Sequence, residues 1–401
     1  MHDVMVIGAG PAGNIAALRL AGLGYRVAVL DWRHRIGDKL CTGIIGTECV
    51  ERFPPDEAHV YRRARSAVVV SPAGKRYRIA RQDVQAYIID RVAYVDSLAR
   101  QAMEAGADYE LGRRVEDIEV SDRGVTALTT GDSGPRRCLA KMVIIASGFG
   151  SPLLKMVGLR NGVSDHMVGC QAEVLADGLE DTEVHMGEEI APGSFGWLVP
   201  LTESRALIGT ISHRRQSGQM EEFLRTQQAK GKVKEVISKP RRWGIPLKPL
   251  RKTYGNRALV VGDAAGLAKP TTGGGIYYAL LSGDLAVGAA DEALMAGDLS
   301  ANSLESYQRG WKAVFGAELR TGRHARMLYE ALRDRQVERL LSVLLSPEIR
   351  EELLTSREFS FDWHSGIITK AVRHRGLGPV FRSFGPMVVP LLVRLGGARL
   401  F

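Results

Sequence analysis

Three glycines at a fixed spacing are the first residues in the chain whose pattern predicts chemistry. The first of them, Gly8, ends the mostly apolar residues 3–8, and Gly10 and Gly13 follow at the start of a helical pattern. Asp31 comes 18 positions after Gly13. Glycines at this spacing allow a tight turn, let the backbone approach a pyrophosphate and permit close packing of a helix on a strand. A carboxylate at this distance accepts hydrogen bonds from ribose hydroxyls. The pattern predicts a dinucleotide-binding turn.

The residues around these glycines supply the elements that would position them. Residues 3–8 have the composition of a buried parallel strand, and Gly13–Leu23 has apolar residues at helical spacing. Gly24 is a typical residue for the end of such a helix, and Tyr25–Asp31 predicts a second strand. A strand, a helix and a strand in this order form a βαβ unit with the fingerprint between its first two elements.

A second glycine-rich stretch follows about 250 residues later. Ala258–Gly262 predicts another parallel strand, and Gly275–Ala296 predicts a helix. Asp263, directly after the strand, is placed to accept a hydrogen bond from a ribityl hydroxyl. Gly275 and Ile276 are placed to present backbone N–H groups to the electron-rich end of an isoalloxazine. The chain has no second glycine fingerprint for a nicotinamide nucleotide, so we expect one FAD held by both stretches.

The remaining patterns predict an α/β fold with α+β elements and interleaved domains. Further expected elements are a hairpin over Ser66–Val70 and Arg76–Ala80, a helix over Arg91–Ala105, strands over Asp108–Val120, Val125–Thr129 and Met142–Ala146, and an amphipathic helical region over Leu304–Leu354. We expect a Rossmann-type FAD-binding domain over 1–60, 82–165 and 251–300, a mixed-sheet substrate domain over 61–81 and 166–250, and a C-terminal helical region over 301–401, a candidate for membrane association.

Composition excludes several protein classes. Of 401 residues, 45% are hydrophobic and 25% are charged, which excludes wholesale disorder and a polytopic membrane protein. The four cysteines form no Cys-x-x-Cys pair, so we expect no metal site and no disulfide framework. Because the strand pattern begins at residue 3, we expect no export signal and a cytoplasmic location.

The positive charge is concentrated near the C-terminus. Residues 301–401 hold 16 Lys and Arg against 10 Asp and Glu, and no nucleic-acid-binding motif accompanies them. An anionic membrane surface is therefore the favoured partner, and nucleic acid is not expected. Gly376–Phe401 is apolar and basic but too interrupted by arginines and prolines to span a bilayer. Two interpretations stay open for it: an anchor lying in the membrane interface, or packing on the protein's own helices or on another subunit.

Four segments together carry a family resemblance. The fingerprint with Asp31, the segment Gly37–Gly43, the run Ile89–Arg91 and the segment Gly262–Ile276 resemble the FAD-dependent geranylgeranyl reductases of the p-hydroxybenzoate hydroxylase-like flavoproteins. Pro192–Pro200 is similar to that family's Pro-x-x-Tyr-x-Trp-x-Phe-Pro signature, with departures at Phe195 and Val199.

The resemblance implies a set of site residues. The implied FAD contacts are Ala12 and Gly13 at the pyrophosphate, Asp31 at the ribose, Cys41, Thr42 and Gly43 beside the flavin, Arg91 at the phosphate or ribityl region, Val115 at the adenine, and Asp263, Gly275 and Ile276 at the ribityl and ring. Cys41 is a candidate catalytic residue whose thiol tunes the flavin or delivers a proton, or else a small packing residue. Phe195, Trp197 and Pro200 form one wall of a substrate pocket, or else belong to ordinary sheet core. Arg91 has the alternative of a surface position at a helix start, and Val115 that of a core strand residue.

The implied reaction is reduction of isolated C=C bonds in a geranylgeranyl or polyprenyl chain by reduced FAD. A lipid, a chlorophyll-type compound and a quinone all fit as the carrier of that chain, and NADPH and reduced ferredoxin both fit as the electron donor. A greasy substrate agrees with a peripheral position on the cytoplasmic face of a membrane. One alternative is a monooxygenase or halogenase of the same superfamily, because Phe195–Pro200 partly echoes a halogenase motif and Ser147-Gly148 stands where many hydroxylases have Asp-Gly. A non-catalytic or electron-carrying flavoprotein is the second alternative.

Overall fold

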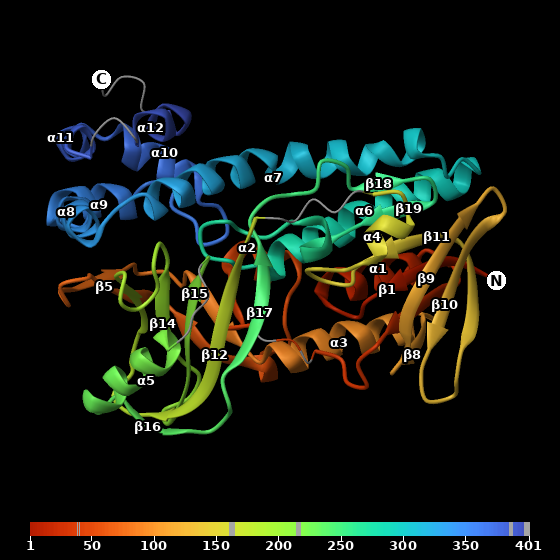
Figure 1. Cartoon of the computed structure of the whole chain (residues 1–401), viewed down its shortest axis with the longest axis horizontal. Coiled ribbons are helices and arrows are strands. Elements are labelled where there is room, and N and C mark those ends of the chain that lie inside the picture. The colour runs from red at the N-terminus through yellow and green to blue at the C-terminus, as the bar shows by residue number, and fades with distance from the viewer. Residues whose placement is uncertain (38, 40, 160–164, 214–217, 385–387, 397–401) are drawn as a thin grey trace.

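Two large sheets and a C-terminal group of helices make up the molecule. The computed structural model describes residues 1–37, 39, 41–159, 165–213, 218–384 and 388–396. Figure 1 shows the first sheet beside the N-terminus, the second sheet at the lower left, and the long helix α7 (Ala301–Glu330) running along one side past both. The model confirms the predicted α/β fold with a C-terminal helical region.

The first sheet has the strand order β18-β19-β11-β1-β2-β8, and β9 and β10 extend it from β11. Strand β1 pairs in parallel with β2 and β11, as β11 does with β19. Helix α1 (Pro11–Gly22) packs between α3 (Arg91–Glu104) and α6 (Ile276–Ala296). The strands are β1 (His2–Ile7), β2 (Val27–Asp31), β8 (Asp108–Leu111), β9 (Arg114–Ser121), β10 (Gly124–Thr130), β11 (Arg136–Ile145), β18 (Tyr254–Gly255) and β19 (Ala258–Val260).

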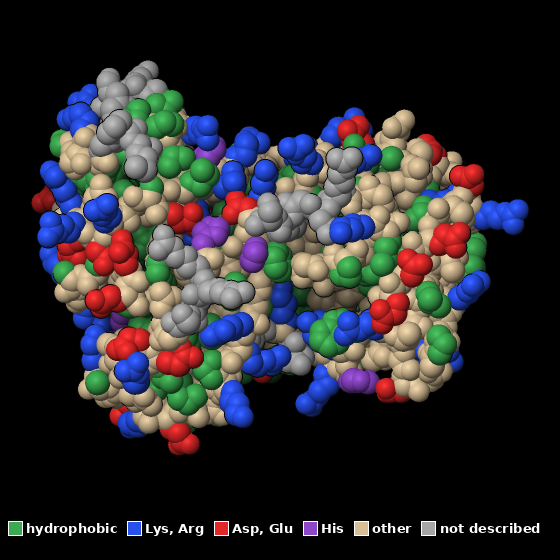
Figure 2. All heavy atoms as spheres, in the orientation of Figure 1, with side chains coloured by type: hydrophobic (Ala, Val, Ile, Leu, Met, Phe, Trp, Pro, Cys, Tyr) green, Lys and Arg blue, Asp and Glu red, His purple; other side chains and the backbone are tan. Residues whose placement is uncertain are grey.

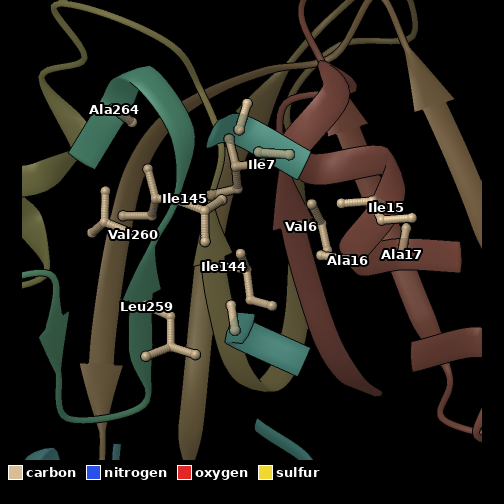
Figure 3. Packing of buried hydrophobic residues seen from close by; sticks show 14 of the residues in the cluster. Val6, Ile7, Ile15, Ala16, Ala17, Ile144, Ile145, Leu259, Val260 and Ala264 are labelled. Atoms are coloured by element: carbon tan, nitrogen blue, oxygen red, sulfur yellow. The ribbon is translucent and has the colours of Figure 1, made fainter. Parts of the chain in front are cut away.

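A continuous apolar core joins this sheet to its helices. Val6, Ile144 and Val260 come from three adjacent parallel strands, and Ile15 comes from α1, in the packing shown in Figure 3. All four side chains are at most 2% exposed. Strands buried on both faces read as continuous apolar runs, which is why the sequence pattern identifies β1, β11 and β19. This core places the carboxyl ends of the strands, and therefore the predicted site, at one edge of the sheet.

The second sheet is mixed and mostly antiparallel, with the order β16-β12-β15-β14-β13-β5-β6 and with β17 beside β12. Its strands are β5 (Ser66–Val70), β6 (Arg76–Ala80), β12 (His166–Ala176), β13 (Thr182–Met186), β14 (Phe195–Pro200), β15 (Arg205–Ser212), β16 (Val233–Val236) and β17 (Arg241–Pro246). Helix α5 (Gln219–Ala229) packs on β15 and β16. A third, small sheet consists of β3 (Ile44–Gly46), β7 (Ala86–Ile89) and β4 (Val60–Ala64), and the short helix α2 (Thr47–Arg52) follows β3. The short helix α4 (Leu153–Met156) packs on β9 of the first sheet.

The structure corrects two expected strands. The predicted strand Met142–Ala146 is only the second half of β11 (Arg136–Ile145), because the mostly exposed first half, which pairs with β10, lacks a continuous apolar run. The predicted strand Asp108–Val120 is two strands, because Gly112 adopts φ +67° and turns the chain between β8 and β9. Strand β8 then pairs with β2, whereas β9 pairs with β10. A local apolar pattern does not distinguish one long strand from two that belong to different partners.

The C-terminal helices form a separate apolar cluster with the second half of α7. They are α8 (Asp334–Leu344), α9 (Pro347–Leu354), α10 (Ser365–Arg373), α11 (Gly378–Arg382) and α12 (Val389–Arg394). Leu377, Phe381 and Leu392 of the tail are at most 3% exposed and pack in this cluster with Leu341 of α8. Of the two interpretations of the tail, its described residues show packing on the protein's own helices. No helix among the described residues is long and apolar enough to cross a membrane.

Candidate functional site

The three fingerprint glycines form the turn between β1 and α1. Gly8 has φ +111°, and a Cβ there would collide with the carbonyl oxygen of Ala146. A Cβ on Gly13 would collide with the carbonyl oxygen of Gly8, so helix and strand pack more closely than a side chain permits. Around Gly10, in contrast, a Cβ would meet no described atom within 4 Å. The turn therefore has open space at the amino end of α1, where backbone N–H groups favour an anion.

Asp31 has two hydrogen bonds to backbone groups. Its Oδ2 accepts from Ala9 N at 2.8 Å, and its Oδ1 accepts from Arg33 N at 2.8 Å. The residue is only 7% exposed. The carboxylate thus holds the glycine turn in shape, in addition to lying where the ribose contact is predicted. The first of these roles depends on the tertiary fold and was missed in the sequence analysis.

A cavity of about 420 Å³ runs from the glycine turn to the start of α6. Figure 2 shows that this face of the molecule is hollowed between the part carrying β12 and β17 and the part carrying β9 and β10, with Lys and Arg side chains gathered around the hollow. The predicted cofactor residues that line the cavity are Gly8, Gly10, Ala12, Asp31, Cys41, Arg91, Val115, Asp263, Gly275 and Ile276. Gly13, Thr42 and Gly43 are not among the described lining residues, since Gly13 packs behind the turn and Gly43 lies against Ile89 at the small sheet.

Lys39 and Asp263 form an ion pair inside this cavity. The Lys39 ammonium donates to Oδ2 of Asp263. The other oxygen, Oδ1, lies 3.0 Å from the position that a Cβ on Gly275 would take, so only glycine fits there without a shift. Helix α6 begins at the next residue, Ile276, with no side chain capping its first N–H groups. This end of the cavity combines a carboxylate, an ammonium and a helix amino terminus.

Arg91 lines the cavity and also braces its rim. Its Nη2 donates to the carbonyl oxygens of Gly37 and Lys39, and its side chain is buried. Asp90 caps helix α3 by accepting from Ala93 N at 3.0 Å, which fixes the residue next to Arg91. The arginine therefore positions the loop that carries Lys39. This corrects the alternative of a surface arginine at a helix start.

An exposed tryptophan between two arginines marks the other end of the cavity. Trp32 is 52% exposed, with the guanidinium of Arg33 4.5 Å and that of Arg114 5.2 Å from its ring centroid. Val115, which follows Arg114 on β9, is 9% exposed and lines the same cavity. Cation–π contacts of this kind order flat side chains beside a binding surface. The pairing of Trp32 with Arg114 was missed because Trp32 directly follows β2 and Arg114 begins β9, two segments that the sequence does not place together.

Cys41 is half-buried and lies between the two sheets. Its carbonyl oxygen accepts from Nε2 of Gln171 on β12 at 3.3 Å, and Cys41 is among the described residues that line the cavity. Gln171 is 3% exposed. The backbone of Cys41 is thus fixed to the second sheet at the border of the space in which a cofactor would lie.

Aromatic rings connect the Pro192–Pro200 segment to this cavity. The rings of Phe195 and Trp197 are 6.2 Å apart, and those of Trp197 and Trp243 are 6.4 Å apart, both in edge-on geometry. Trp243 lines the cavity, and Trp197 belongs to an apolar cluster that Trp243 also contacts. Phe195 and Trp197 lie near the cavity but are not among its described lining residues, and Pro200 is buried at the end of β14. The row Phe195–Trp197–Trp243 is called the aromatic row below.

A segment from the C-terminal region fastens the loop that precedes α6. Lys269 is 5% exposed; its Nζ donates to Phe361 O at 2.6 Å and lies 3.8 Å from Oδ1 of Asp362. Burial lowers the pKa of Lys269. Thr271 Oγ1 and Nδ1 of His364 are 2.7 Å apart. Because this loop continues into Gly273 and Gly275 of the cavity wall, residues 361–364 support the site from outside.

These features together fit an extended FAD. Open space beside Gly10 accommodates a pyrophosphate, Trp32 and Val115 border the adenosine end, and Asp263 with the start of α6 borders the flavin end. The cationic side chains of the lining, Arg33, Arg35, Lys39, Arg91, Arg113 and Arg114, complement the charge of the cofactor.

Comparison with known proteins identifies the family of the chain. A model of the pyridine nucleotide-disulphide oxidoreductase family matches residues 2–183. Digeranylgeranylglycerophospholipid reductase 1 of Methanopyrus kandleri is 30% identical over 367 residues, which are 88% of this chain and 96% of the relative.

Solved structures share the fold. A geranylgeranyl bacteriochlorophyll reductase-like protein of Thermoplasma acidophilum superimposes with a TM-score of 0.83 at 22% identity, over 95% of this chain and 98% of its own. The p-nitrophenol 4-monooxygenase of Pseudomonas putida reaches a TM-score of 0.70 at 17% identity, over 88% of this chain and 96% of its own. Both solved structures are less than 25% identical to this chain and show only the shared fold. The Methanopyrus reductase is 30% identical over nearly its whole length, and this identity shows that the chain belongs to the FAD-dependent geranylgeranyl reductase family.

Proposed function

We propose that this protein saturates C=C bonds of geranylgeranyl chains carried by a glycerophospholipid. The observation that carries the proposal is the aromatic row, which leads from the Pro192–Pro200 segment to Trp243 in the wall of the flavin cavity. The name of the Methanopyrus relative, a digeranylgeranylglycerophospholipid reductase, supports this carrier over a chlorophyll-type compound or a quinone.

The surroundings of the aromatic row suit an isoprenoid chain. Met167, Ile211 and Ile245 pack around Trp197, and each of these four side chains is at most 6% exposed. Nε1 of Trp197 has no hydrogen-bond partner among the described residues. These buried side chains form an apolar layer beside Trp243 that excludes water from this side of the flavin cavity, where an apolar chain would be held by burial rather than by hydrogen bonds.

Different residues of the cavity have different roles in the proposed reaction. When bound, FAD would supply two electrons, as a hydride equivalent, to one carbon of the double bond. We assign to the Cys41 thiol the delivery of a proton to the neighbouring carbon, since Cys41 is a residue of the cavity lining and its backbone is held by Gln171. Lys39 and Asp263 orient the flavin end, and Arg91 holds Lys39 in place through hydrogen bonds to the carbonyl oxygens of Gly37 and Lys39.

We also propose that the protein associates peripherally with anionic membranes, on the cytoplasmic face. The support is charge: Arg375, Arg382 and Arg394 are exposed on the C-terminal helices. Figure 2 shows Lys and Arg side chains around this part of the molecule, at the upper left. The buried positions of Leu377, Phe381 and Leu392 leave electrostatic attraction, rather than insertion of the tail, as the basis of binding.

An anaerobic experiment tests the proposed reaction. The purified protein is reduced with dithionite and mixed with geranylgeranyl glycerophospholipids, the flavin spectrum is followed, and the lipids are analysed by mass spectrometry. We expect the flavin to reoxidise while the lipids gain mass in steps of two hydrogens. Reoxidation that begins only when oxygen is admitted would instead favour a monooxygenase. Separate mixing of the oxidised protein with NADPH and with reduced ferredoxin identifies the electron donor by the faster bleaching of the flavin.

A further inference from the structure

We propose that a second cavity, under the carboxyl half of α7, binds the phosphate-bearing polar head of the lipid substrate; this inference rests on the proposed function. The cavity has a volume of about 770 Å³ and is lined by side chains of α7, of the end of β15 and of the loop before β14. Its charged groups include Arg323 and Arg326 of α7 and His213, with the carboxylates Asp165 and Glu330 between them. We call it the head-group cavity.

Arg326 is the central group, because it is a buried cation whose hydrogen bonding is incomplete. It is 4% exposed; its Nη2 donates to Ser194 Oγ at 2.7 Å and contacts the sulfur of Met167. Its Nε lies 3.2 Å from Oε1 of Glu330, but neither atom has an aligned hydrogen bond among the described residues. A guanidinium has five N–H donors, and leaving buried donors unmatched is costly. A phosphate oxygen at this position would accept a hydrogen bond from the unmatched N–H donors of Arg326.

Two further cationic groups, Arg323 and His213, lie near Arg326 and are each paired with a carboxylate. Arg323 donates to Oδ2 of Asp165 at 2.8 Å, and Nε2 of His213 lies 3.0 Å from Oε1 of Glu330. Asp165 and Glu330, with Glu188 as a third carboxylate of the lining, hold the cations in place and can accept hydrogen bonds from hydroxyl groups of a glycerol backbone.

Apolar residues connect the head-group cavity to the flavin cavity. Pro192 lines the head-group cavity, and three residues later Phe195 begins the aromatic row that ends at Trp243 in the flavin cavity. Leu247 lines the head-group cavity and Ile245 the flavin cavity, and both belong to one apolar cluster. A molecule with a charged head and a prenyl chain matches this order of polar cavity, apolar layer and flavin site.

A purely structural role of Arg326, as a brace between α7 and β14, makes a different prediction. Loss of a brace weakens binding of every ligand alike, whereas loss of a phosphate contact weakens only ligands that carry phosphate. Geranylgeranyl diphosphate and geranylgeraniol share one chain and differ in that group, so they are the probes. The variants are Arg326→Gln and, as a change at a more exposed side chain, Arg323→Gln. Arg309→Gln removes an exposed arginine from the distant amino half of the same helix and is the control.

Dissociation constants of both probes are measured by calorimetry on the FAD-loaded full chain. We expect Arg326→Gln to weaken the binding of geranylgeranyl diphosphate about 10- to 100-fold and Arg323→Gln to weaken it less. Both variants should change the dissociation constant of geranylgeraniol less than about threefold. Arg309→Gln should bind both probes as the wild type does. Equal losses for the two probes in Arg326→Gln and Arg323→Gln, or equal affinity of the wild type for both, would overturn the head-group cavity.

Competition by inorganic diphosphate tests whether the cavity binds the polar head of the lipid or only an unrelated free anion. We expect it to compete with geranylgeranyl diphosphate in the wild type; binding that depends on Arg326 but does not compete would mean an anion site unrelated to the lipid, and would overturn the proposal. The proposed function is tested apart from this. If the reduced wild type saturates neither probe and no geranylgeranyl phospholipid, the proposed function fails, and the binding measurements still decide the site.

Discussion

Lys39 and Asp263 stand 224 positions apart in the chain and form an ion pair in the flavin cavity. The lysine belongs to the loop held by Arg91, and the aspartate lies three residues after β19, the last parallel strand of the first sheet. The pair therefore closes the cavity between the early and late parts of the nucleotide-binding fold, and it places an ammonium next to the carboxylate that the sequence pattern assigns to the ribityl chain.

Replacing Asp263 by alanine should release most of the FAD on purification. Loss of a hydrogen bond to a charged group, with Lys39 left unpaired, corresponds to roughly 10- to 100-fold weaker binding. The ratio of flavin to protein absorbance measures the outcome. Glu292→Ala, an exposed change at the other end of α6, should retain the cofactor. Full flavin content in Asp263→Ala would contradict the assigned role.

Replacing Cys41 by alanine should slow C=C reduction and leave flavin binding intact. Removal of a proton donor costs about 100- to 10,000-fold in rate. Single-turnover reoxidation of the reduced protein by a geranylgeranyl lipid measures this step, and reduction by dithionite should proceed as in the wild type. Cys138→Ser on β11, outside the described cavity lining, serves as the control. An unchanged rate in Cys41→Ala would leave the thiol with a packing role only.

The buried His364 should make the protein less stable in mild acid. Burial, together with Lys269, lowers its pKa to about 3, from an ordinary value of 6.5. The unfolded chain takes up a proton below pH 6.5 and the folded protein does not, so stability is complete above pH 6.5 and falls as the pH approaches 3. At pH 5 this one group accounts for about 2 kcal/mol of lost stability.

Thermal unfolding at pH 7 and pH 5 tests the contribution of His364. The decrease in melting temperature between the two pH values should be smaller in His364→Gln than in the wild type. His34→Gln changes a histidine whose side chain is 69% exposed, and its melting temperature should decrease between the two pH values by as much as that of the wild type. An identical decrease in all three proteins would mean that His364 is not the group responsible.

Charge on the C-terminal helices should govern membrane binding. Removing two exposed arginines, in Arg375→Gln with Arg394→Gln, should reduce binding to vesicles with anionic lipids about tenfold or more, because each basic residue near such a surface contributes about 1 kcal/mol. Flotation with vesicles measures the bound fraction. Arg309→Gln with Lys312→Gln removes the same charge from the amino half of α7 and should bind as the wild type does. Equal binding of all three proteins would argue against this surface.

Local patterns were enough to predict the nucleotide-binding unit but not its supports. The turn at Gly8 and the acidic residue Asp263 follow directly from strand and helix signals, because their neighbours in sequence are their neighbours in space. The partners Lys39, Trp243 and Asp362 come from distant segments, and only the tertiary fold brings them to the site.

The C-terminal tail shows the same limit. Its alternation of apolar and basic residues fits a membrane interface and a protein interface equally well, because both bury one face of a short helix. The cluster formed by Leu377 with Leu341 depends on where α8 lies, which composition does not specify.

The attachment of residues 361–364 to the loop before α6 has a consequence for the timing of synthesis. The glycine turn is complete once the first 31 residues have emerged, but the far wall needs Asp263 and Gly275, and its outer support needs Asp362. At about 5–20 residues per second, a ribosome takes roughly 20–60 s to pass from the first of these to the last. The nucleotide pocket of the nascent chain is therefore incomplete until late in translation, and we expect the cofactor to bind near the end of synthesis.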